Sequence, residues 1–357
     1  MLNPNINIVD FTEEEYSLYS KHIILNEIGL NGQKRLKTAK VLVVGAGGLG
    51  CPILLYLTLS GIGYIGLIDD DNINLSNLTR QILYTHKDIN NKKARSAQHI
   101  LKNINPNVKI ITHICYLNYY NAKEIIQYYD IIIDGSDNFI TRYSIDYICY
   151  KLHKVHIYGA VQEFNNQISV CNYQGGHRYS DIYPRIMNLT ETNCNNSGIL
   201  GIITGQTGIK QTTETIKLII GHGQILKNKL RISNSYNLQQ KTISIYQLKY
   251  NFQINFLYND KKTKISDYLS YNLHEVSLII DIRDNEEFLA YHLSHSINIP
   301  LNLLIVNKSI FFLTRNYKNK ILSIYCNTMY RSLIASHILQ YNKIECHVIN
   351  SNRYNKK

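Results

Sequence analysis

Short apolar runs alternate with amphipathic segments along the first 130 or so residues of the chain. Apolar runs bounded by polar or turn-forming residues are typical of buried strands in a parallel sheet. This alternation predicts a doubly wound, Rossmann-like α/β fold whose sheet has a parallel core. We expect strands at residues 41–44, 64–68, 108–113 and 130–133, a helix from Pro52, and helices at 93–103 and 121–129.

The regions on either side of this alternation predict further elements. Residues 11–28 have the spacing of an amphipathic helix, and the glycines at 29–32 are expected to end it. Its apolar side consists of Tyr16, Tyr19, Ile23 and Ile24. We expect strands at 155–158 and 167–171, a polar loop at 173–196, a helix at 198–221, and short strands with polar turns at 228–264.

A second alternation of strands and helices begins at Val276. The polar stretch at 259–262 before it is typical of a linker. We therefore place a domain boundary near Lys262. The chain is predicted to have a first domain at 1–261 and a small α/β domain at 262–357.

Charge and cysteine content exclude several classes of protein. The net charge is +12, but the lysines and arginines stand in ones and twos, so we expect no nucleic-acid partner. No apolar run reaches the roughly 18 to 20 residues that cross a bilayer, so we expect no membrane association. The seven cysteines are widely spaced without a CxxC pair, which favours a reducing compartment over a disulfide framework.

Composition also indicates a compartment. The chain contains 29 Tyr and no Trp, and Tyr, Asn, Ile and Lys are the residues that AT-rich codons specify. The acidic residues that follow Asp10 match neither a secretory signal nor a transit peptide. We expect an organelle-encoded plastid protein, with a bacterial-type cytoplasm as the alternative.

A glycine-rich stretch follows the first predicted strand. Glycines there allow a sharp turn and a close approach of the backbone to a phosphate, and the next helix presents free N–H groups to that phosphate. Asp69 ends the second strand, where an acid that binds a ribose belongs. Alone, these features favour NAD or FAD and an oxidoreductase. The glycines are Gly45, Gly47, Gly48 and Gly50.

The residues after Asp69 favour a triphosphate over a dinucleotide. Arg80 and Lys93 add cations beyond those that a pyrophosphate in a glycine loop requires. Asp137 follows another strand of the same predicted sheet, where a carboxylate can hold Mg²⁺ against phosphates. The motifs read Ser76-Asn77-Leu-Thr-Arg80-Gln81 and Ser136-Asp137-Asn138.

Taken in order and spacing, these motifs resemble the ubiquitin-activating-type adenylyltransferases, and most of all the molybdopterin-synthase adenylyltransferases and their thiamine-pathway relatives. The resemblance covers about residues 11–223. It implies an enzyme that uses ATP and Mg²⁺ to adenylate the C-terminal glycine of a small ubiquitin-like sulfur carrier ending in Gly-Gly. By resemblance the glycine loop faces the nucleotide, Asp69 holds the ribose, Asp137 binds Mg²⁺, and Ser76, Asn77, Arg80, Lys93 and Asn138 complete the ATP site.

Two further residues receive roles from the resemblance. Cys194 precedes a Gly-Ile-Leu-Gly segment as a cysteine does in the family, where a thiolate can attack the acyl-adenylate. Lys21 stands where relatives bring an arginine from a partner subunit, which implies a homodimer and a weaker contact. The two CxxC pairs that bind zinc in relatives are missing, so we expect no zinc site.

The C-terminal region resembles a rhodanese domain. Residues 278–300 match its first signature, and the stretch from Cys326 to Ser332 matches the active loop in length. Loop amides, a helix N-terminus and Arg331 can stabilise a thiolate or a persulfide at Cys326. The usual loop glycine and the common end of the domain are absent.

Our leading hypothesis is an adenylyltransferase for a molybdopterin-synthase-type sulfur carrier, acting in molybdenum-cofactor biosynthesis, with possible sulfur transfer through Cys326. The carrier of a thiamine or tRNA-thiolation pathway is an alternative substrate. Two rival classes are a non-catalytic carrier-binding scaffold, suggested by Lys21 and the missing zinc ligands, and an NAD-dependent oxidoreductase.

Overall fold

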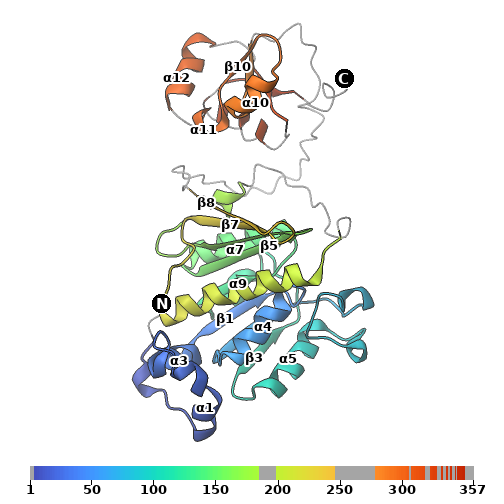
Figure 1. Cartoon of the computed structure of the whole chain (residues 1–357), viewed down its shortest axis with the longest axis vertical. Coiled ribbons are helices and arrows are strands. Elements are labelled where there is room, and N and C mark those ends of the chain that lie inside the picture. Colours follow the sequence, from blue (N-terminus) through green and yellow to red (C-terminus); the bar gives the residue numbers. More distant parts are fainter. Residues whose placement is uncertain are drawn as a thin grey trace. The chain divides into compact units, whose positions relative to one another are not determined.

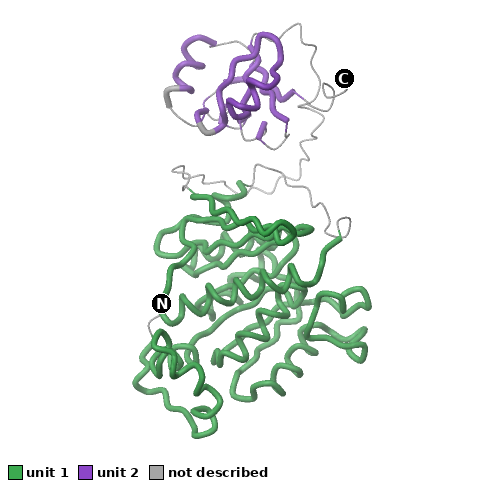
Figure 2. Tube along the Cα trace, in the orientation of Figure 1, with its two compact units in different colours: residues 1–184, 189–250 green, residues 185–188, 251–357 purple. Residues whose placement is uncertain are grey.

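The computed structural model describes residues 4–184, 198–245, 278–304, 307–317, 322–327, 331–332, 335–336, 338–339, 342 and 344–349. These residues divide into two compact units (Figure 2), one within residues 1–250 and the other within 251–357. The predicted boundary near Lys262 lies outside the described residues. None of the helices in the described part of the chain combines the length and apolar character of a membrane span.

The first unit is built on an eight-stranded sheet within its described residues, with strand order β3-β2-β1-β4-β5-β6-β7-β8 (Figure 1). Neighbouring strands from β3 to β5 are parallel, and those from β5 to β8 are antiparallel. The predicted doubly wound α/β fold with a parallel core is therefore confirmed. The strands are β1 (Lys40–Val44), β2 (Tyr64–Ile68), β3 (Lys109–His113), β4 (Ile131–Asp134), β5 (Val155–Gln162), β6 (Asn165–Cys171), β7 (Lys229–Asn234) and β8 (Gln239–Ser244).

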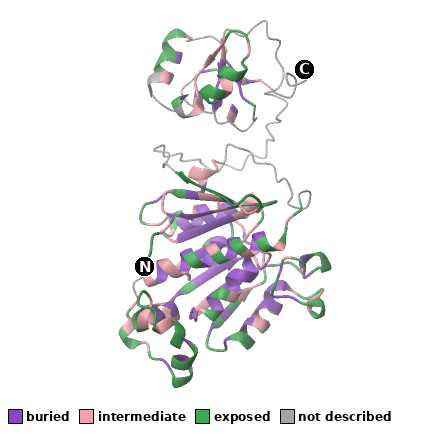
Figure 3. Cartoon of the chain, in the orientation of Figure 1, coloured by how far each residue is buried: buried purple, intermediate pink, exposed green. Residues whose placement is uncertain are grey.

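Helices cover both faces of this sheet because alternate residues of its strands point to opposite faces. Val41 and Val43 of β1 belong to the core beneath α4 (Gly50–Leu59), α5 (Lys93–Ile104) and α9 (Gly201–Ile220), while Leu42 and Val44 belong to the core beneath α6 (Ala122–Ile126) and α7 (Phe139–Lys151). The central strands are accordingly buried (Figure 3). Short elements complete the unit: η1 (Ile6–Ile8), η2 (Leu75–Asn77), η3 (His86–Asp88) and α8 (Tyr179–Ile182).

The N-terminal region differs from the predicted single helix. It forms α1 (Glu13–Leu18) and α2 (Ser20–Ile23), and α3 (Gly29–Thr38) begins at the glycines that were expected to end a helix. The break falls at Tyr19, which is buried and whose hydroxyl accepts a hydrogen bond from Asn105 Nδ2 at 2.9 Å. Of the predicted apolar side, Tyr19 is buried and Ile23 is half-buried, whereas Tyr16 is 45% exposed and Ile24 is 70% exposed.

The second unit contains a four-stranded sheet within its described residues, with order β10-β9-β11-β12 and parallel neighbours. A separate apolar core, to which Ile280, Leu313 and Ile324 belong, lies between this sheet and its helices. The elements are β9 (Leu278–Asp281), α10 (Asn285–Ala290), β10 (Ser296–Asn298), α11 (Leu301–Leu304), α12 (Asn307–Asn316), β11 (Leu322–Tyr325) and β12 (Cys346–Val348).

Candidate functional site

The carboxyl ends of β2, β1 and β4 lie side by side in the first unit, because β1 pairs with both of the other strands in parallel. The chain runs from β1 to β2 on one side and reaches β4 on the other, so β1 and β4 mark the point where the strand order reverses. Ligands of open α/β sheets bind at such a point. Gly45, Asp69 and Asp137 follow these three strands, so the topology brings these predicted residues to one edge.

Steric contacts explain why two positions in the glycine-rich stretch after β1 must be glycine. Gly45 has a φ of +93°, and a Cβ there would lie 2.8 Å from the carbonyl oxygen of Gly135 in the loop after β4. A Cβ on Gly50 would lie 1.9 Å from the carbonyl oxygen of Gly45. Both glycines are therefore required for the turn itself.

The other two glycines of this stretch are not required for the turn itself. A Cβ on Gly48 would lie 3.0 Å from Thr204 Oγ1, so Gly48 lets α9 pack closely against the loop. A Cβ on Gly47 would meet only Gln81 Nε2, at 3.8 Å. The fold therefore does not require a glycine at Gly47, although a ligand that approaches the backbone there would.

Asp69 joins the glycine loop to the loop after β2. Its Oδ2 accepts a hydrogen bond from Ala46 N at 2.8 Å, and its Oδ1 accepts one from Asp71 N at 2.9 Å. Burial raises the pKa of Asp69, although these hydrogen bonds and Lys93 oppose the rise. Each carboxylate oxygen retains a further acceptor position for a ligand hydroxyl.

Lys93 is the first residue of α5, and its ammonium group lies at this edge. Its Nζ donates to Asp71 Oδ2 at 2.7 Å, and its side chain is only 8% exposed. The backbone of the same two residues is also joined, since Lys93 N donates to Asp71 O at 3.0 Å. The structure thus connects the glycine loop, Asp69, Asp71 and Lys93 through direct hydrogen bonds.

Tyr84 is a member of this edge that the sequence did not reveal. Its buried hydroxyl lies 3.0 Å from Ala46 O and 3.3 Å from Lys93 O, and its proton can be donated to either carbonyl. Cys51 Sγ also donates to Ala46 O, at 3.4 Å, and burial raises the pKa of this thiol to about 12, which makes it a poor nucleophile. No local motif marks Tyr84, because its partners are backbone atoms of two distant segments.

The Ser-Asn-Leu-x-Arg-Gln motif forms η2 and the turn after it. Asn77 is buried, and its Oδ1 accepts a hydrogen bond from Asn74 N at 3.1 Å, which fixes the turn. Arg80 Nη1 donates to the carbonyl oxygen of Ser76 at 2.9 Å. Gln81 is 3% exposed, and its Oε1 has no hydrogen-bond partner among the described residues. A buried acceptor without a partner beside the glycine loop suits a ligand that donates to it.

A buried carboxylate, that of Asp134, fixes the loop after β4 through hydrogen bonds. Asp134 Oδ1 accepts hydrogen bonds from Ser136 N at 3.0 Å and from Ser136 Oγ at 2.6 Å, and Asp134 Oδ2 lies 3.3 Å from His156 Nε2. Burial favours a higher pKa for Asp134, but the hydrogen bond from His156 and the charge of Arg142 outweigh it, so this pKa is lowered. Asp134 was not among the predicted site residues, although it lies in the stretch that contains Asp137.

The remaining predicted residues lie in different settings. Asp137 is an exposed residue of this loop, whereas Asn138 caps α7, its Oδ1 accepting from Thr141 N at 2.8 Å. Lys21 is exposed on α2, and among the described residues no hydrogen bond or ion pair joins it to the glycine loop. Cys194 lies outside the described residues.

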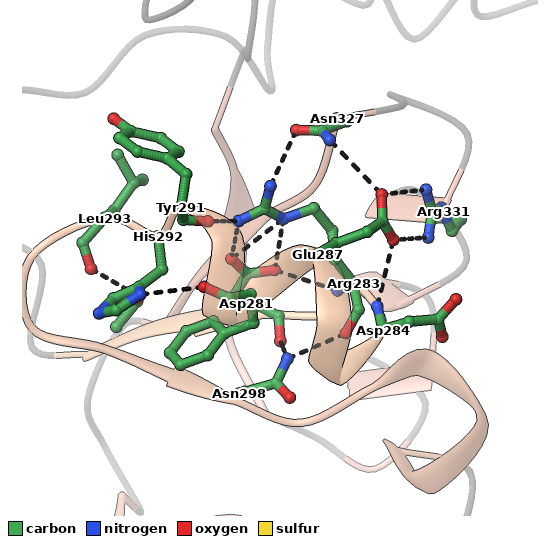
Figure 4. A network of polar contacts seen from close by, with 12 residues as sticks. Asp281, Arg283, Asp284, Glu287, Tyr291, His292, Leu293, Asn298, Asn327 and Arg331 are labelled. Carbon is green, nitrogen blue, oxygen red and sulfur yellow. Dashed lines mark hydrogen bonds and ion pairs between the residues drawn. The ribbon is translucent and has the colours of Figure 1, made fainter.

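The second unit has its own polar network, drawn in Figure 4. Cys326 directly follows β11, has 1% of its surface exposed, and is followed by Asn327. Arg283 pairs with Asp281 at 2.6 Å, and Arg331 pairs with Glu287 at 2.9 Å. Residues Leu322–Tyr325 form β11, and the described residues from Arg331 to Leu339 are helical.

Fold and site together define the class. A doubly wound sheet with a glycine loop at its switch point is joined to a small parallel α/β unit that has a cysteine after a strand. Family models agree with both units: the ThiF family matches residues 19–251 and the rhodanese-like domain matches residues 266–351. The chain belongs to the ThiF family and carries a rhodanese-like domain, which confirms the resemblance found in the sequence.

Relatives cover nearly the whole chain. A "Probable molybdopterin-synthase adenylyltransferase" of Gracilaria tenuistipitata var. liui is 41% identical over 95% of this chain and 97% of its own. The protein of the same name from Porphyra purpurea is 41% identical over 95% of this chain and 92% of its own. The "Adenylyltransferase and sulfurtransferase MOCS3" of Aedes aegypti is 33% identical over 82% of this chain and 74% of its own.

Solved structures share the fold of the first unit. A crystal structure of E. coli MccB with MccA-N7isoASN has a TM-score of 0.58 at 21% identity, and covers 65% of this chain and 72% of that chain. A crystal structure of PaaA has a TM-score of 0.58 at 22% identity, and covers 68% of this chain and 78% of that chain. At this identity the likeness concerns the fold alone.

Proposed function

We propose that the chain adenylates the C-terminal glycine of a small ubiquitin-like sulfur-carrier protein ending in Gly-Gly. The carrier is of the type found as the small subunit of molybdopterin synthase, and the reaction belongs to molybdenum-cofactor biosynthesis. The observation that carries the proposal is the direct hydrogen-bonded connection of the glycine loop, Asp69 and Lys93 at the switch point of the sheet. The relatives that carry the name adenylyltransferase support it.

ATP fits this edge on two structural grounds. The buried Gln81 Oε1 is an acceptor without a partner in the described part of the chain, and suits a hydroxyl or amino group of the nucleotide. The open space at Gly47 leaves the backbone amides accessible to phosphate oxygens. Asp69 would accept from the ribose, while Ser76, Asn77, Arg80 and Asn138 would border the nucleotide.

The proposed reaction joins two anions, so its rate depends on charge neutralisation and alignment. A carboxylate oxygen of the carrier glycine forms a bond to the α-phosphorus of ATP. The bond from that phosphorus to the oxygen that bridges to the β-phosphate breaks, and pyrophosphate leaves with the electron pair. Lys93 and Arg80 stabilise the charge that develops on the phosphates, and no covalent bond to the protein is required in this step.

Asp137 would hold Mg²⁺, which supplies further charge neutralisation at the phosphates when it is bound. Mg²⁺ in nucleotide sites is held by one or two carboxylates together with substrate phosphates and water. The exposed carboxylate of Asp137 suits that arrangement.

We also propose that the active form is a homodimer in which Lys21 reaches the phosphates of the partner subunit. Lys21 is exposed, and apolar side chains around it are exposed as well: Leu18 is 52% exposed and Leu25 is 48% exposed. A second copy that covers these side chains would remove apolar surface from water.

Cys326 is proposed to carry sulfur as a persulfide, and Cys194 to form a covalent link with the activated carrier. Cys326 directly follows β11 and precedes a helical segment, whose N-terminus would stabilise an anionic sulfur. We further propose that the protein is encoded in a plastid, since its composition suits AT-rich codons and its relatives include proteins of red algae. A thiamine-pathway or tRNA-thiolation carrier remains the alternative substrate, and a carrier-binding scaffold the alternative function.

Pyrophosphate exchange into ATP in the presence of the carrier tests the adenylation step. Lys93→Met should abolish the exchange, because the buried ammonium beside the glycine loop is lost. Lys102→Met, an exposed lysine near the other end of α5, serves as the matched control and should retain it. Carrier binding without exchange by the unmodified chain would support the scaffold instead.

A further inference from the structure

Two carboxylates of the second unit pair with arginines: Asp281 with Arg283, and Glu287 with Arg331. Arg283 Nε donates to Asp281 Oδ1 at 3.0 Å, and Arg283 Nη2 donates to Asp281 Oδ2 at 2.6 Å. Arg331 donates to both oxygens of Glu287, from Nη1 at 2.9 Å and from Nη2 at 3.3 Å. Each positive charge is therefore matched by a negative charge through a two-point contact.

Asn327 connects the two pairs directly beside Cys326. Its Oδ1 accepts from Arg283 Nη1 at 3.3 Å, and its Nδ2 donates to Glu287 Oε1 at 3.5 Å (Figure 4). Glu287 thus contacts the residue after the cysteine as well as the arginine at the start of the following helical segment. The side chain of Glu287 is 34% exposed, so it lies within reach of an entering ligand.

The charge of Arg331 is linked to both Glu287 and the cysteine. The hydrogen bond from Arg331 to Glu287 raises the pKa of this arginine first of all, and the negative charge of a Cys326 thiolate raises it further. A planar guanidinium fork is the group best suited to bind an oxyanion, but here Glu287 occupies two of its donors. An oxyanion that approached would also meet the negative charge of Glu287.

We propose that Glu287 is a specificity-determining residue that, by engaging Arg331, makes the Cys326 site select a persulfide as sulfur donor over an oxyanion donor such as thiosulfate. This inference rests on the proposed sulfur transfer by Cys326.

The two donors differ in the charge at the reacting end of the group that leaves, which is a single charge on a thiolate sulfur or the charge of sulfite. With a persulfide, the Cys326 thiolate attacks the terminal sulfur, a new S–S bond forms, and the donor's S–S bond breaks as a thiolate leaves with the electron pair. With thiosulfate, the same attack on the outer sulfur releases sulfite, a dianion at high pH. Neither transfer needs an oxidant. Sulfite requires a nearby cation to leave far more than a thiolate does. Glu287 counteracts this need, because it neutralises the charge of Arg331.

The test measures sulfur loading of Cys326 in the full chain from thiosulfate and from glutathione persulfide. The readout is the mass gain of one sulfur atom on the peptide that contains Cys326, with Cys326→Ala as the background. We expect the unmodified chain to load faster from the persulfide. Glu287→Gln should raise the rate with thiosulfate about tenfold, because the charge of Arg331 becomes available to steer an anion, and this gain should shrink as salt is added.

Glu286→Gln is the matched control, since it removes the same charge from an exposed position in α10 and should leave the donor preference unchanged. Equal loading of the unmodified chain from both donors would overturn the inference, and this comparison needs no variant to fold. A Glu287→Gln variant that folds and keeps the original donor ratio would also overturn it. If neither donor loads Cys326 in the unmodified chain, the proposed sulfur transfer itself fails.

Discussion

Lys93 Nζ lies 2.7 Å from the Asp71 carboxylate, and the two ends of this ion pair have opposite surroundings: the lysine side chain is 8% exposed, and the aspartate side chain is 68% exposed. A buried ammonium without a partner is costly, whereas an exposed carboxylate loses little by changing partners. In the proposed reaction, Asp71 would hold Lys93 at the edge of the site and release it to a phosphate.

Asp71→Asn should lower kcat/KM for ATP in carrier-dependent pyrophosphate exchange by roughly threefold to tenfold, since Lys93 loses the charge that positions it. Asp70→Asn is the matched control, because Asp70 is an exposed neighbour whose side chain lies outside this pair. Equal losses in the two variants would show that only the overall charge of the loop matters.

Tyr84→Phe removes a hydroxyl that lies between the carbonyls of Ala46 and Lys93. The free energy of unfolding should fall by about 1 to 2 kcal/mol, because the buried hydrogen bond from this hydroxyl to a backbone carbonyl is lost. The KM for ATP should also rise, since the glycine loop and the start of α5 are no longer fixed to each other. Tyr56→Phe, on the exposed side of α4, should change neither quantity, and a normal KM in Tyr84→Phe would refute the positioning role.

Two glycines of the same loop should respond differently to alanine. Gly50→Ala should prevent folding of the first unit or destabilise it severely, because the new Cβ would lie 1.9 Å from a backbone oxygen. Gly47→Ala should fold normally but bind ATP more weakly, since its methyl group would occupy the space proposed for phosphate. Thermal unfolding and an ATP titration separate the two effects. Unchanged ATP affinity in Gly47→Ala would place the phosphates elsewhere.

Asp134 should make the first unit sensitive to acid. Its pKa is lowered in the folded state from a usual value of 3.8, so its ionised form stabilises the fold. This stabilisation is complete above about pH 4 and is lost as the pH falls from there through the lower folded value. Asp134→Asn should therefore be less stable at neutral pH and lose less further stability below pH 4. Asp130→Asn, at the other end of the same strand, is the control for denaturant unfolding measured across this range.

The local sequence pattern was sufficient to predict the elements that form the sheet edge at which we propose that ATP binds. The strand at 64–68 and the helix start at Lys93 were predicted at their observed positions, because buried strands and amphipathic helices leave periodic signals. Gly45 and Asp69 were assigned to the site because each directly follows a predicted strand. The roles assigned to these residues in binding ATP stay predictions, since they depend on a ligand.

The features that the sequence pattern did not predict depend on contacts between residues that are far apart in the sequence. Tyr19 interrupts the predicted N-terminal helix through a buried contact with Asn105, which lies far along the chain. Tyr84 and Asp134 act through backbone atoms and buried groups that no spacing rule identifies. Pairing of Glu287 with Arg331 likewise joins two motifs that the sequence presents separately.

The central claim is tested most directly by pyrophosphate exchange into ATP with two forms of a molybdopterin-synthase-type carrier, one intact and one lacking its last glycine. We predict exchange with the intact carrier, together with a carrier mass increased by one adenylyl group, and neither signal with the shortened carrier. Exchange that is independent of the carrier's last glycine would contradict the account, and so would no exchange with any carrier that ends in Gly-Gly.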